Sequence, residues 1–215
     1  RVQKAVIIPE AMYRRLLIDA GCELDYYASD ITRTFPFNGR FSAEQRAVYE
    51  IVLDAQNAAI DKVVKGNHWN EPHDAAVKVI TRGLRMLGLL SGSLPKLIKD
   101  GAYREFYMHR TGHWIGIDVH DVGDYKVSDE WRVLETGMVT TVEPGIYFIP
   151  ELIDQWKTQG KFEDFIDYNK VEDYRDFGGI RIEDNILVHD AGKRVLGKPI
   201  AKTVAEVETL SSQIS

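Results

Sequence analysis

The first part of the chain contains two short apolar runs that are bounded by turn residues. Residues 16–21 form an apolar run that ends at a glycine, which is typical of a strand. Residues 31–35 form a second run, which a proline and an Asn-Gly pair stop. We assign no element to residues 1–15, whose composition is mixed. Two strands are therefore predicted near the start of the chain.

Three helices are predicted to follow these strands. The first begins at Ser42, which with Gln45 has the spacing of a capping box, and it ends at Gly66. Its apolar residues recur every three or four positions, so we expect them to face the core. A second helix is predicted over residues 72–87, and a third, opened by a Ser-Leu-Pro sequence, over residues 93–101.

Strands dominate the second half of the pattern. The expected strands cover residues 138–142, 146–149, 180–183 and 186–188. The first two flank a Glu-Pro-Gly turn, and the long polar and aromatic stretch 150–177 is expected to be a surface excursion. A terminal helix is predicted over residues 204–210. Because the helices gather in the first half and strands mostly flank them, the pattern indicates an α+β fold rather than regular βαβ alternation.

Composition narrows the class of protein. The 215 residues suit one large domain, 1–215, with 44% hydrophobic and 28% charged residues, as in ordinary globular proteins. The net charge of −6 gives no electrostatic reason to expect nucleic acid or a membrane as a partner. No apolar run approaches the roughly 20 residues of a membrane span, and no signal peptide is evident. The single cysteine, Cys22, suits a reducing compartment, and we expect a cytoplasmic location.

Three of the six histidines lie within residues 109–120. His109 and His113 are four residues apart, so a helix would place them on one face. Gly112 and Gly116, together with nearby β-branched residues, argue against that helix. An extended chain would place Ile115, Ile117 and Val119 on one face and Trp114, Gly116, Asp118 and His120 on the other. Since histidine binds transition metals and carries protons near neutral pH, we predict a functional site here.

Two aspartates lie in the apolar surroundings of the first two strands. Asp19 and Asp30 would face each other, about 5 Å apart, if the chain between them formed a hairpin centred on Leu24-Asp25. Two carboxylates placed in this way persist if a cation lies between them or if one is protonated. The alternative is that either residue is a solvated turn residue.

Two glutamates occur in similar apolar contexts. Glu143 shares a strand face with Val139 and Thr141, and Glu183 lies in an Ile-rich strand. Arg181 precedes Glu183 by two residues, so it shares its face and would orient a carboxylate. The alternative for this pair is a plain ion pair on a solvated face.

Four carboxylates and one histidine are too many anionic ligands for a single cation. They suit two divalent cations that share bridging carboxylates, and one imidazole among the oxygens favours a transition metal. Two metals bridged by a water supply a hydroxide near neutral pH, which indicates a hydrolase. The sequence has no CxxC, HExxH or P-loop motif, so it does not support structural zinc, zincin or nucleotide-binding interpretations.

Five motifs in this order resemble the ligand positions of the pita-bread metallopeptidases. They are IDAG, SDITRTFP, GHWIGIDVHDVG, TVEPGIYF and GIRIEDN. The resemblance implies a curved, mostly antiparallel sheet covered by helices, and two divalent metal ions, which we expect to be Mn²⁺. The implied metal ligands are Asp19, Asp30, His113, Glu143 and Glu183.

His109 and Arg181 resemble residues of the proline-specific branch, which contains Xaa-Pro aminopeptidases and Xaa-Pro dipeptidases. The run YMHRTGHWIGIDVHDVGDYKV is most similar to bacterial aminopeptidases P. The implied activity removes the N-terminal residue from peptides whose second residue is proline, and attack by a metal-bridging hydroxide would cleave the bond. Such a peptide is the implied partner, and a homo-oligomer is compatible with the resemblance.

The resemblance also implies roles for the site residues. Asp30 and Glu183 would bridge the metals, Asp19 would complete the metal that meets the substrate amine, and His113 and Glu143 would complete the other. Glu143 would also accept a proton from the bridging water. His120 would hydrogen-bond the scissile carbonyl and its oxyanion. His109 would line the pocket for the residue before proline or for the proline ring, and Arg181 would orient Glu183 and Asp30.

The resemblance has two departures. Family catalytic domains carry helices and a hairpin before the IDAG strand. Here only about fifteen residues precede that strand. We therefore expect a catalytic domain with a short early part and no separate N-terminal domain. Residues 150–177 form a longer stretch than in typical aminopeptidases P and are closer to the excursion of the dipeptidases. Xaa-Pro dipeptidase therefore stays open as an alternative activity. A pita-bread module that binds without catalysis is a second alternative, although such modules lose the metal ligands.

Overall fold

The computed structural model describes residues 2–9 and 15–212, with the backbone alone for residues 2–9 and 15. The strands are β1 (Val2–Pro9), β2 (Arg15–Leu24), β3 (Tyr27–Pro36), β4 (Lys126–Val127), β5 (Glu130–Trp131), β6 (Val139–Val142), β7 (Gly145–Phe148), β8 (Gly178–Arg181), β9 (Asp184–His189) and β10 (Gly192–Val195). The helices are α1 (Ala43–Ile60), α2 (Glu71–Met86), α3 (Leu94–Asp100), the short 3-10 helix η1 (Ala102–Glu105), α4 (Pro150–Gln159), α5 (Tyr168–Glu172) and α6 (Val204–Ser212).

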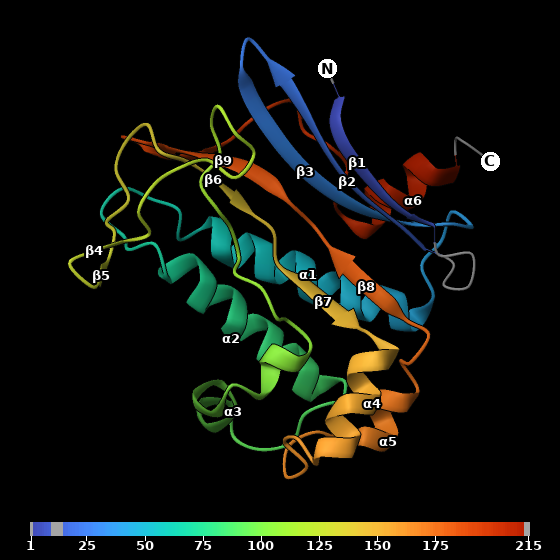
Figure 1. The fold of residues 1–215 in the computed structure, drawn as a ribbon. Coiled ribbons are helices and arrows are strands. Elements are labelled where there is room, and N and C mark those ends of the chain that lie inside the picture. Colours follow the sequence, from blue (N-terminus) through green and yellow to red (C-terminus); the bar gives the residue numbers. More distant parts are fainter. Residues whose placement is uncertain (1, 10–14, 213–215) are drawn as a thin grey trace.

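Strands β1, β2 and β3 form an antiparallel sheet in that order (Figure 1). The sequence pattern predicts no element for β1, and it predicts β2 and β3 as shorter strands. Asp25 and Tyr26 have φ values of 51° and 71°, so the hairpin turns on these two residues, as a two-residue loop of a twisted hairpin requires.

The expectation that Asp19 directly faces Asp30 is wrong. The turn is centred one residue later than expected, so Asp19 lies opposite Thr32 and Asp30 lies opposite Gly21. A shift of two in the register leaves both aspartates on the same face of the sheet, as diagonal neighbours. The hairpin therefore still brings the two carboxylates together.

Strands β6 to β10 form a three-stranded sheet and a two-stranded sheet that follow one another along the chain. Strand β6 pairs with β9, which also pairs with β10, and β7 pairs with β8. The breaks between β6 and β7 and between β8 and β9 lie side by side, and they carry Glu143 and Glu183. The backbone N–H of Glu183 donates to the carbonyl of Thr32 over 3.0 Å, which joins the break between β8 and β9 to β3.

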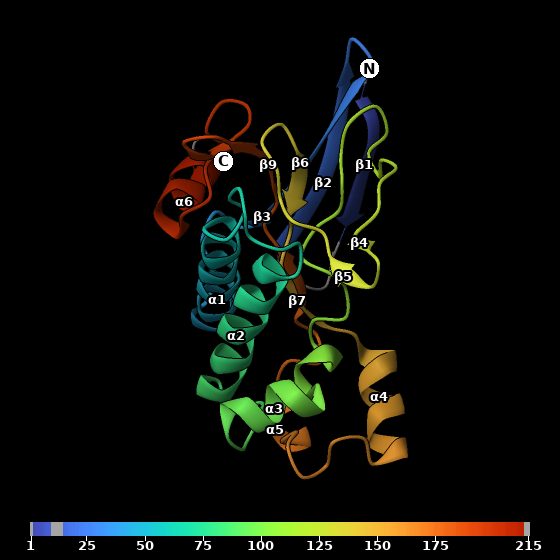
Figure 2. The same cartoon turned by 90° about the vertical axis from the view of Figure 1, so that its left-hand side faces the viewer.

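Helices α1 and α2 pack on each other and lie on one side of the strands, away from β1 (Figure 2). Helix α1 begins with the predicted capping box of Ser42 and Gln45, but it ends at Ile60, before the predicted Gly66. Helix α2 agrees with the prediction to within a residue, and α3 ends at Gly101 in a left-handed conformation with φ 81°. The apolar faces of α1 and α2 form much of the core.

The segment 150–177 is not a plain surface excursion. It contains α4 and α5, and Ile153, Trp156 and Val171 are buried in the core. One face of α4 carries the apolar residues Leu152, Ile153 and Trp156 at helical spacing. Because most of their neighbours in the sequence are polar, this periodicity is weak in the sequence. Tyr174 stacks on Phe148 of β7 with ring centroids 4.8 Å apart, so the excursion is anchored to the sheet.

Residues 109–120 form neither a helix nor a regular strand. A bridge between Trp114 and Thr140 is followed by a closed turn in which the N–H of Asp121 donates to the carbonyl of Trp114 over 3.1 Å. The expected alternation therefore fails: Ile115 is buried, whereas Ile117 is 63% exposed. The reason is this local loop closure, which turns the backbone before the alternation can continue.

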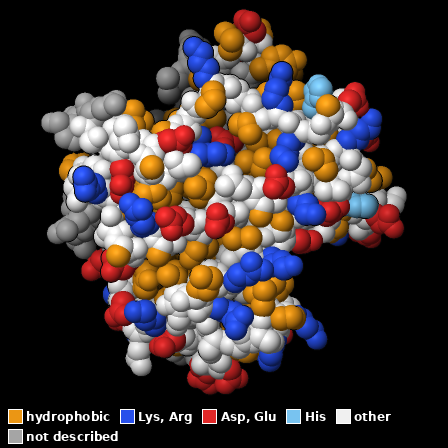
Figure 3. Space-filling model, turned by 180° about the vertical axis from the view of Figure 1, so that it is seen from behind, with side chains coloured by type: hydrophobic (Ala, Val, Ile, Leu, Met, Phe, Trp, Pro, Cys, Tyr) orange, Lys and Arg blue, Asp and Glu red, His pale blue; other side chains and the backbone are white. Residues whose placement is uncertain are grey.

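The face of the molecule seen in Figure 3 carries acidic and basic side chains of both signs, with apolar side chains exposed between them. This mixture agrees with the modest net charge of −6. Among the described residues, no helix is both long and apolar enough to cross a membrane.

Candidate metal centre

All of the residues predicted for the site line one cleft of about 450 Å³. They are Asp19, Asp30, His109, His113, His120, Glu143, Arg181 and Glu183, and Arg110 and Gly112 complete the lining. The residues come from β2, β3, β8, the 109–120 segment and the breaks between β6 and β7 and between β8 and β9. Folding thus gathers four carboxylates and three imidazoles from segments that are far apart in the sequence.

Three of these side chains form a group with metal-binding geometry. One ligand atom from each of Asp30, His113 and Glu183 lies within 4.8 Å of the others. His113 Nε2 is 3.6 Å from Asp30 Oδ2 and 3.4 Å from Glu143 Oε1. Carboxylate oxygens with one imidazole nitrogen are a suitable donor set for a divalent transition metal.

Glu183 is the strongest structural indication of a bound cation. The residue is 1% exposed, and its Oε2 accepts a 2.6 Å hydrogen bond from Thr32 Oγ1. Its buried Oε1 finds no hydrogen-bond donor within the described chain. Burial, reinforced by the charges of Glu143 and Asp30, raises the pKa of Glu183 well above its usual value. Because a buried, unpartnered carboxylate oxygen is costly, a cation at this position fits the site.

His113 is oriented for ligation through Nε2. Its Nδ1 lies 2.9 Å from the carbonyl oxygen of Trp114, so the proton is placed on Nδ1 and Nε2 faces Asp30 and Glu143. Burial lowers the pKa of His113, but the hydrogen bond to Asp30 and the charges of the two carboxylates outweigh burial and raise it. A neutral, correctly oriented imidazole would result once a cation replaces the proton.

Thr141 connects His113 to Glu143. Its hydroxyl accepts the N–H of His113 over 3.0 Å and donates to Glu143 Oε1 over 3.1 Å. Burial raises the pKa of Glu143, although the charges of His113 and Arg181 oppose this effect. The predicted shared strand face of Thr141 and Glu143 therefore corresponds to a direct contact.

Arg181 holds Asp19 rather than Glu183. Its Nη2 bonds the Asp19 carboxylate, and its Nε donates to Thr32 Oγ1 over 3.2 Å. It reaches Glu183 through Thr32, whose hydroxyl donates to that carboxylate. Because Glu183 is buried and Arg181 is largely buried, the alternative of an ion pair on a solvated face does not apply.

His109 and Tyr147 form a neutral pair beside this arginine. Nδ1 of His109 lies 2.8 Å from the carbonyl oxygen of Arg110 and is placed as its donor, so Nε2 accepts a hydrogen bond from the Tyr147 hydroxyl over 2.8 Å. Arg181 Nη1 donates to the same hydroxyl over 3.3 Å. Burial lowers the pKa of His109 and raises that of Tyr147 to about 12, which keeps both side chains uncharged.

His120 lies beside His113 at the cleft, with ring centroids 4.3 Å apart and planes at 82°. It is the more exposed of the two rings. An exposed imidazole next to a candidate ligand can donate to a substrate without being a ligand itself.

Sequence reasoning missed Thr32 and Tyr147. Thr32 carries a usable signal, because it follows Asp30 by two positions and so shares its strand face. Tyr147 has no such signal: its contacts to His109 and Arg181 depend on how β7 and β8 pair.

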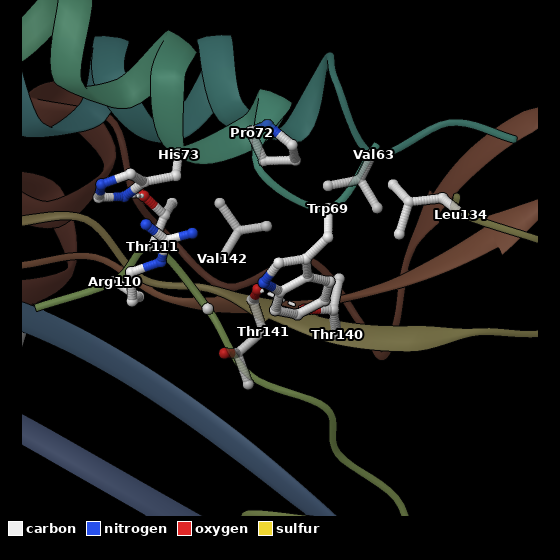
Figure 4. Close-up of a pocket in the computed structure, with 11 residues that line it drawn as sticks. Val63, Trp69, Pro72, His73, Arg110, Thr111, Leu134, Thr140, Thr141 and Val142 are labelled. Carbon is white, nitrogen blue, oxygen red and sulfur yellow. Dashed lines mark hydrogen bonds between the residues drawn. The ribbon is translucent and has the colours of Figure 1, made fainter. Parts of the chain in front are cut away.

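A small cavity of about 20 Å³ lies on the other side of the 110–112 backbone. Figure 4 shows His73 and Thr111 side by side in its wall, with Trp69 across from them. His73 Nδ1 is 2.9 Å from Thr111 Oγ1, and the carbonyl of Thr111 accepts the N–H of Glu143 over 2.7 Å. The residues that line this cavity therefore contact the backbone that positions Glu143.

Comparisons with known proteins agree with this geometry. The model of metallopeptidase family M24 matches residues 10–190. The chain is 48% identical to "Xaa-Pro aminopeptidase" of Haemophilus influenzae, over 91% of this chain and 41% of that protein. It is 42% identical to "Xaa-Pro aminopeptidase" of Escherichia coli, over 91% and 40%. The chain thus spans about two fifths of the length of these relatives.

Solved structures give the same result. The structure of Pseudomonas aeruginosa aminopeptidase PepP superposes with a TM-score of 0.82 at 54% identity, over 93% of this chain and 41% of that one. Zn-substituted E. coli aminopeptidase P in complex with product superposes with a TM-score of 0.79 at 38% identity, over 94% and 42%. These matches confirm the predicted α+β pita-bread fold, and a metallopeptidase family implies divalent metal ions. The chain therefore belongs to metallopeptidase family M24.

Proposed function

We propose that this chain carries the active site of a metal-dependent Xaa-Pro aminopeptidase, which removes an N-terminal residue that precedes proline. The observation that carries the proposal is the single cleft that gathers all five ligand-type residues around the unpartnered Glu183 Oε1. The names of the relatives, both Xaa-Pro aminopeptidases, support the choice of substrate. A binding module without catalysis is disfavoured, because the complete set of ligand-type side chains is present.

Two divalent ions, which we propose to be Mn²⁺, would be held by the five carboxylate and imidazole residues. Asp30 and Glu183 would be shared between the ions, Asp19 would complete one set, and His113 with Glu143 would complete the other. When bound, such ions activate water as a nucleophile and polarise the scissile carbonyl. The zinc of one similar structure shows that the metal in that protein can be exchanged, so the identity of the ion needs its own measurement.

The protein's own side chains would perform the remaining steps. Glu143, whose pKa is raised by burial, is suited to accept a proton from the attacking water and to pass it to the leaving nitrogen. His120 is exposed at the cleft and would donate a hydrogen bond to the carbonyl oxygen as charge develops there. An Xaa-Pro bond has no N–H, so the leaving nitrogen must be recognised by ring contacts. The uncharged His109 offers such a surface.

Xaa-Pro dipeptidase is the second candidate, kept because the length of the sequence stretch 150–177 is similar to the excursion of the dipeptidases. The two activities differ in the length of peptide that is cleaved. We would incubate the protein with Xaa-Pro-Yaa tripeptides and Xaa-Pro dipeptides, in Mn²⁺ and after chelation. The aminopeptidase predicts chelator-sensitive cleavage of tripeptides. Cleavage of dipeptides alone would support the dipeptidase, and cleavage that survives complete metal removal would reject both.

A further inference from the structure

We propose that Arg110 binds the free C-terminal carboxylate of a short peptide substrate, so that this site favours tripeptides and similar short chains over long or C-terminally blocked ones. This inference rests on the proposed peptidase function and names the substrate class of that same site. It concerns a residue outside the predicted ligand and catalytic sets.

The first observation is the charge of the cleft. Its lining contains four acidic residues and two arginines, Arg110 and Arg181. Arg181 is already engaged, because it bonds Asp19, Tyr147 and Thr32. The guanidinium of Arg110 forms no hydrogen bond or ion pair with any side chain of the described chain. One cation on the cleft is thus available to a ligand.

The second observation is that this cation has a defined position. The Arg110 guanidinium carbon lies 4.7 Å from the ring centroid of Trp131, within the range of a cation–π contact. Lys126 Nζ also lies 4.7 Å from that centroid. Stacking on the ring leaves the N–H donors of the guanidinium at its edge, where a carboxylate can pair with two of them.

The third observation is the chemistry of the two ends of a peptide. The carboxylate and imidazole residues that would hold the metals at the reacting end line the same cleft as Arg110. A cleft of about 450 Å³ has the size of a small-ligand site. An extended peptide advances by about 3.3–3.6 Å per residue, so only the carboxylate of a short peptide can reach a fixed cation. A longer chain would present a neutral carbonyl there.

The test compares an Xaa-Pro-Yaa tripeptide with the same tripeptide amidated at its C-terminus. We expect the wild-type protein in Mn²⁺ to show a kcat/KM about ten times higher or more for the free acid, since a hydrogen bond to a charged group contributes at least about a tenfold preference. In Arg110→Gln this ratio should fall to about one, mainly through KM. Lys126→Gln is the matched control, because it removes a cation from the same ring without touching the cleft lining, and it should keep the preference.

A binding measurement separates this inference from the proposed function. We would titrate Pro-Leu and Pro-Leu amide into the Mn²⁺-loaded protein by calorimetry, and expect tighter binding of the acid in the wild type only. If neither tripeptide form is cleaved, the proposed function fails, and the calorimetric preference still decides the role of Arg110. Equal use or binding of acid and amide by the wild type, or a preference retained in Arg110→Gln, would overturn the inference.

Discussion

Thr32 Oγ1 donates a 2.6 Å hydrogen bond to Glu183 Oε2, and these two residues are 151 positions apart in the chain. The same hydroxyl accepts the Nε–H of Arg181, whose guanidinium holds Asp19. One buried threonine therefore positions a carboxylate at the break between β8 and β9, and it contacts Arg181, which holds a carboxylate on β2. Outer contacts of this kind orient metal ligands and sustain metal affinity.

Replacing Thr32 with valine should weaken metal binding. Thr32→Val keeps the shape of the side chain but removes the donor to Glu183, so we expect Mn²⁺ affinity to fall by about 10- to 100-fold in a calorimetric titration. Thr34→Val is the matched control, since within the described part of the chain the Thr34 hydroxyl bonds only the backbone of Arg181. The control should lose stability but keep its Mn²⁺ affinity. Equal losses of affinity in both variants would contradict the positioning role of Thr32.

His120→Ala should separate catalysis from metal binding. Loss of a donor to the developing oxyanion typically lowers kcat by about 10²–10³, whereas Mn²⁺ content should be unchanged because His120 is not among the proposed ligands. The measurements are steady-state kinetics on an Xaa-Pro-Yaa peptide and metal analysis. His189→Ala, at an exposed position on β9, controls for the loss of an imidazole. A variant that loses metal would make His120 a ligand instead.

The buried ion pair between Arg33 of β3 and Asp184 of β9 should be important for the stability of the fold. Arg33 Nη2 and Asp184 Oδ1 are 2.6 Å apart, and both side chains are about 5% exposed or less. Asp184→Asn would leave a buried guanidinium without its charge partner, so we expect a loss of about 3–5 kcal/mol in the free energy of unfolding. The exposed pair of Lys65 and Asp190 is the comparison. Asp190→Asn should change the free energy of unfolding much less in the same urea titration, because water screens this exposed pair.

His73 should make the protein less stable at acidic pH. Burial and the charge of Arg110 lower the pKa of His73 from 6.5 to about 4. Its folded pKa is thus below its unfolded pKa, so the stabilisation is present above pH 6.5 and is lost as the pH falls towards 4. The expected loss is about 3 kcal/mol, from about 1.4 kcal/mol per pKa unit.

Urea unfolding of wild type and His73→Gln between pH 7 and pH 4 measures this contribution. The variant should show a smaller fall in stability across that range, because the group that must stay neutral is gone. His68→Gln is the control, since His68 is half exposed. Parallel curves for wild type and His73→Gln would show that His73 does not titrate in this way.

The local sequence pattern was sufficient to predict most helices and strands and to single out the residues that line the cleft. Period-two alternation and turn residues predicted β3, β6 and β8, and the capping box of Ser42 located the start of α1. These features depend on neighbours in the sequence. The site residues were recognisable because each places a charge or an imidazole in an apolar segment, where such a group is costly without a partner.

What could not be predicted depends on contacts between distant segments. The register of the hairpin was wrong because two positive φ values at Asp25 and Tyr26 decide the turn, and neither residue is a glycine. The helices of residues 150–177 were missed because their few apolar residues are anchored by Phe148 and the core. The contact of Arg181 with Asp19 depends on how β8 meets β2 and β3, which no local pattern reports.

The number of Mn²⁺ ions bound per chain tests the central claim most directly. We would dialyse the wild-type protein and Glu183→Gln against Mn²⁺ and determine the bound metal by atomic spectroscopy. We expect two ions per wild-type chain, and loss of metal in the variant, because Glu183 is proposed to be shared by both ions. Wild-type protein that binds no Mn²⁺, or a Glu183→Gln variant that still binds two ions with unchanged affinity, would contradict the proposed two-metal site.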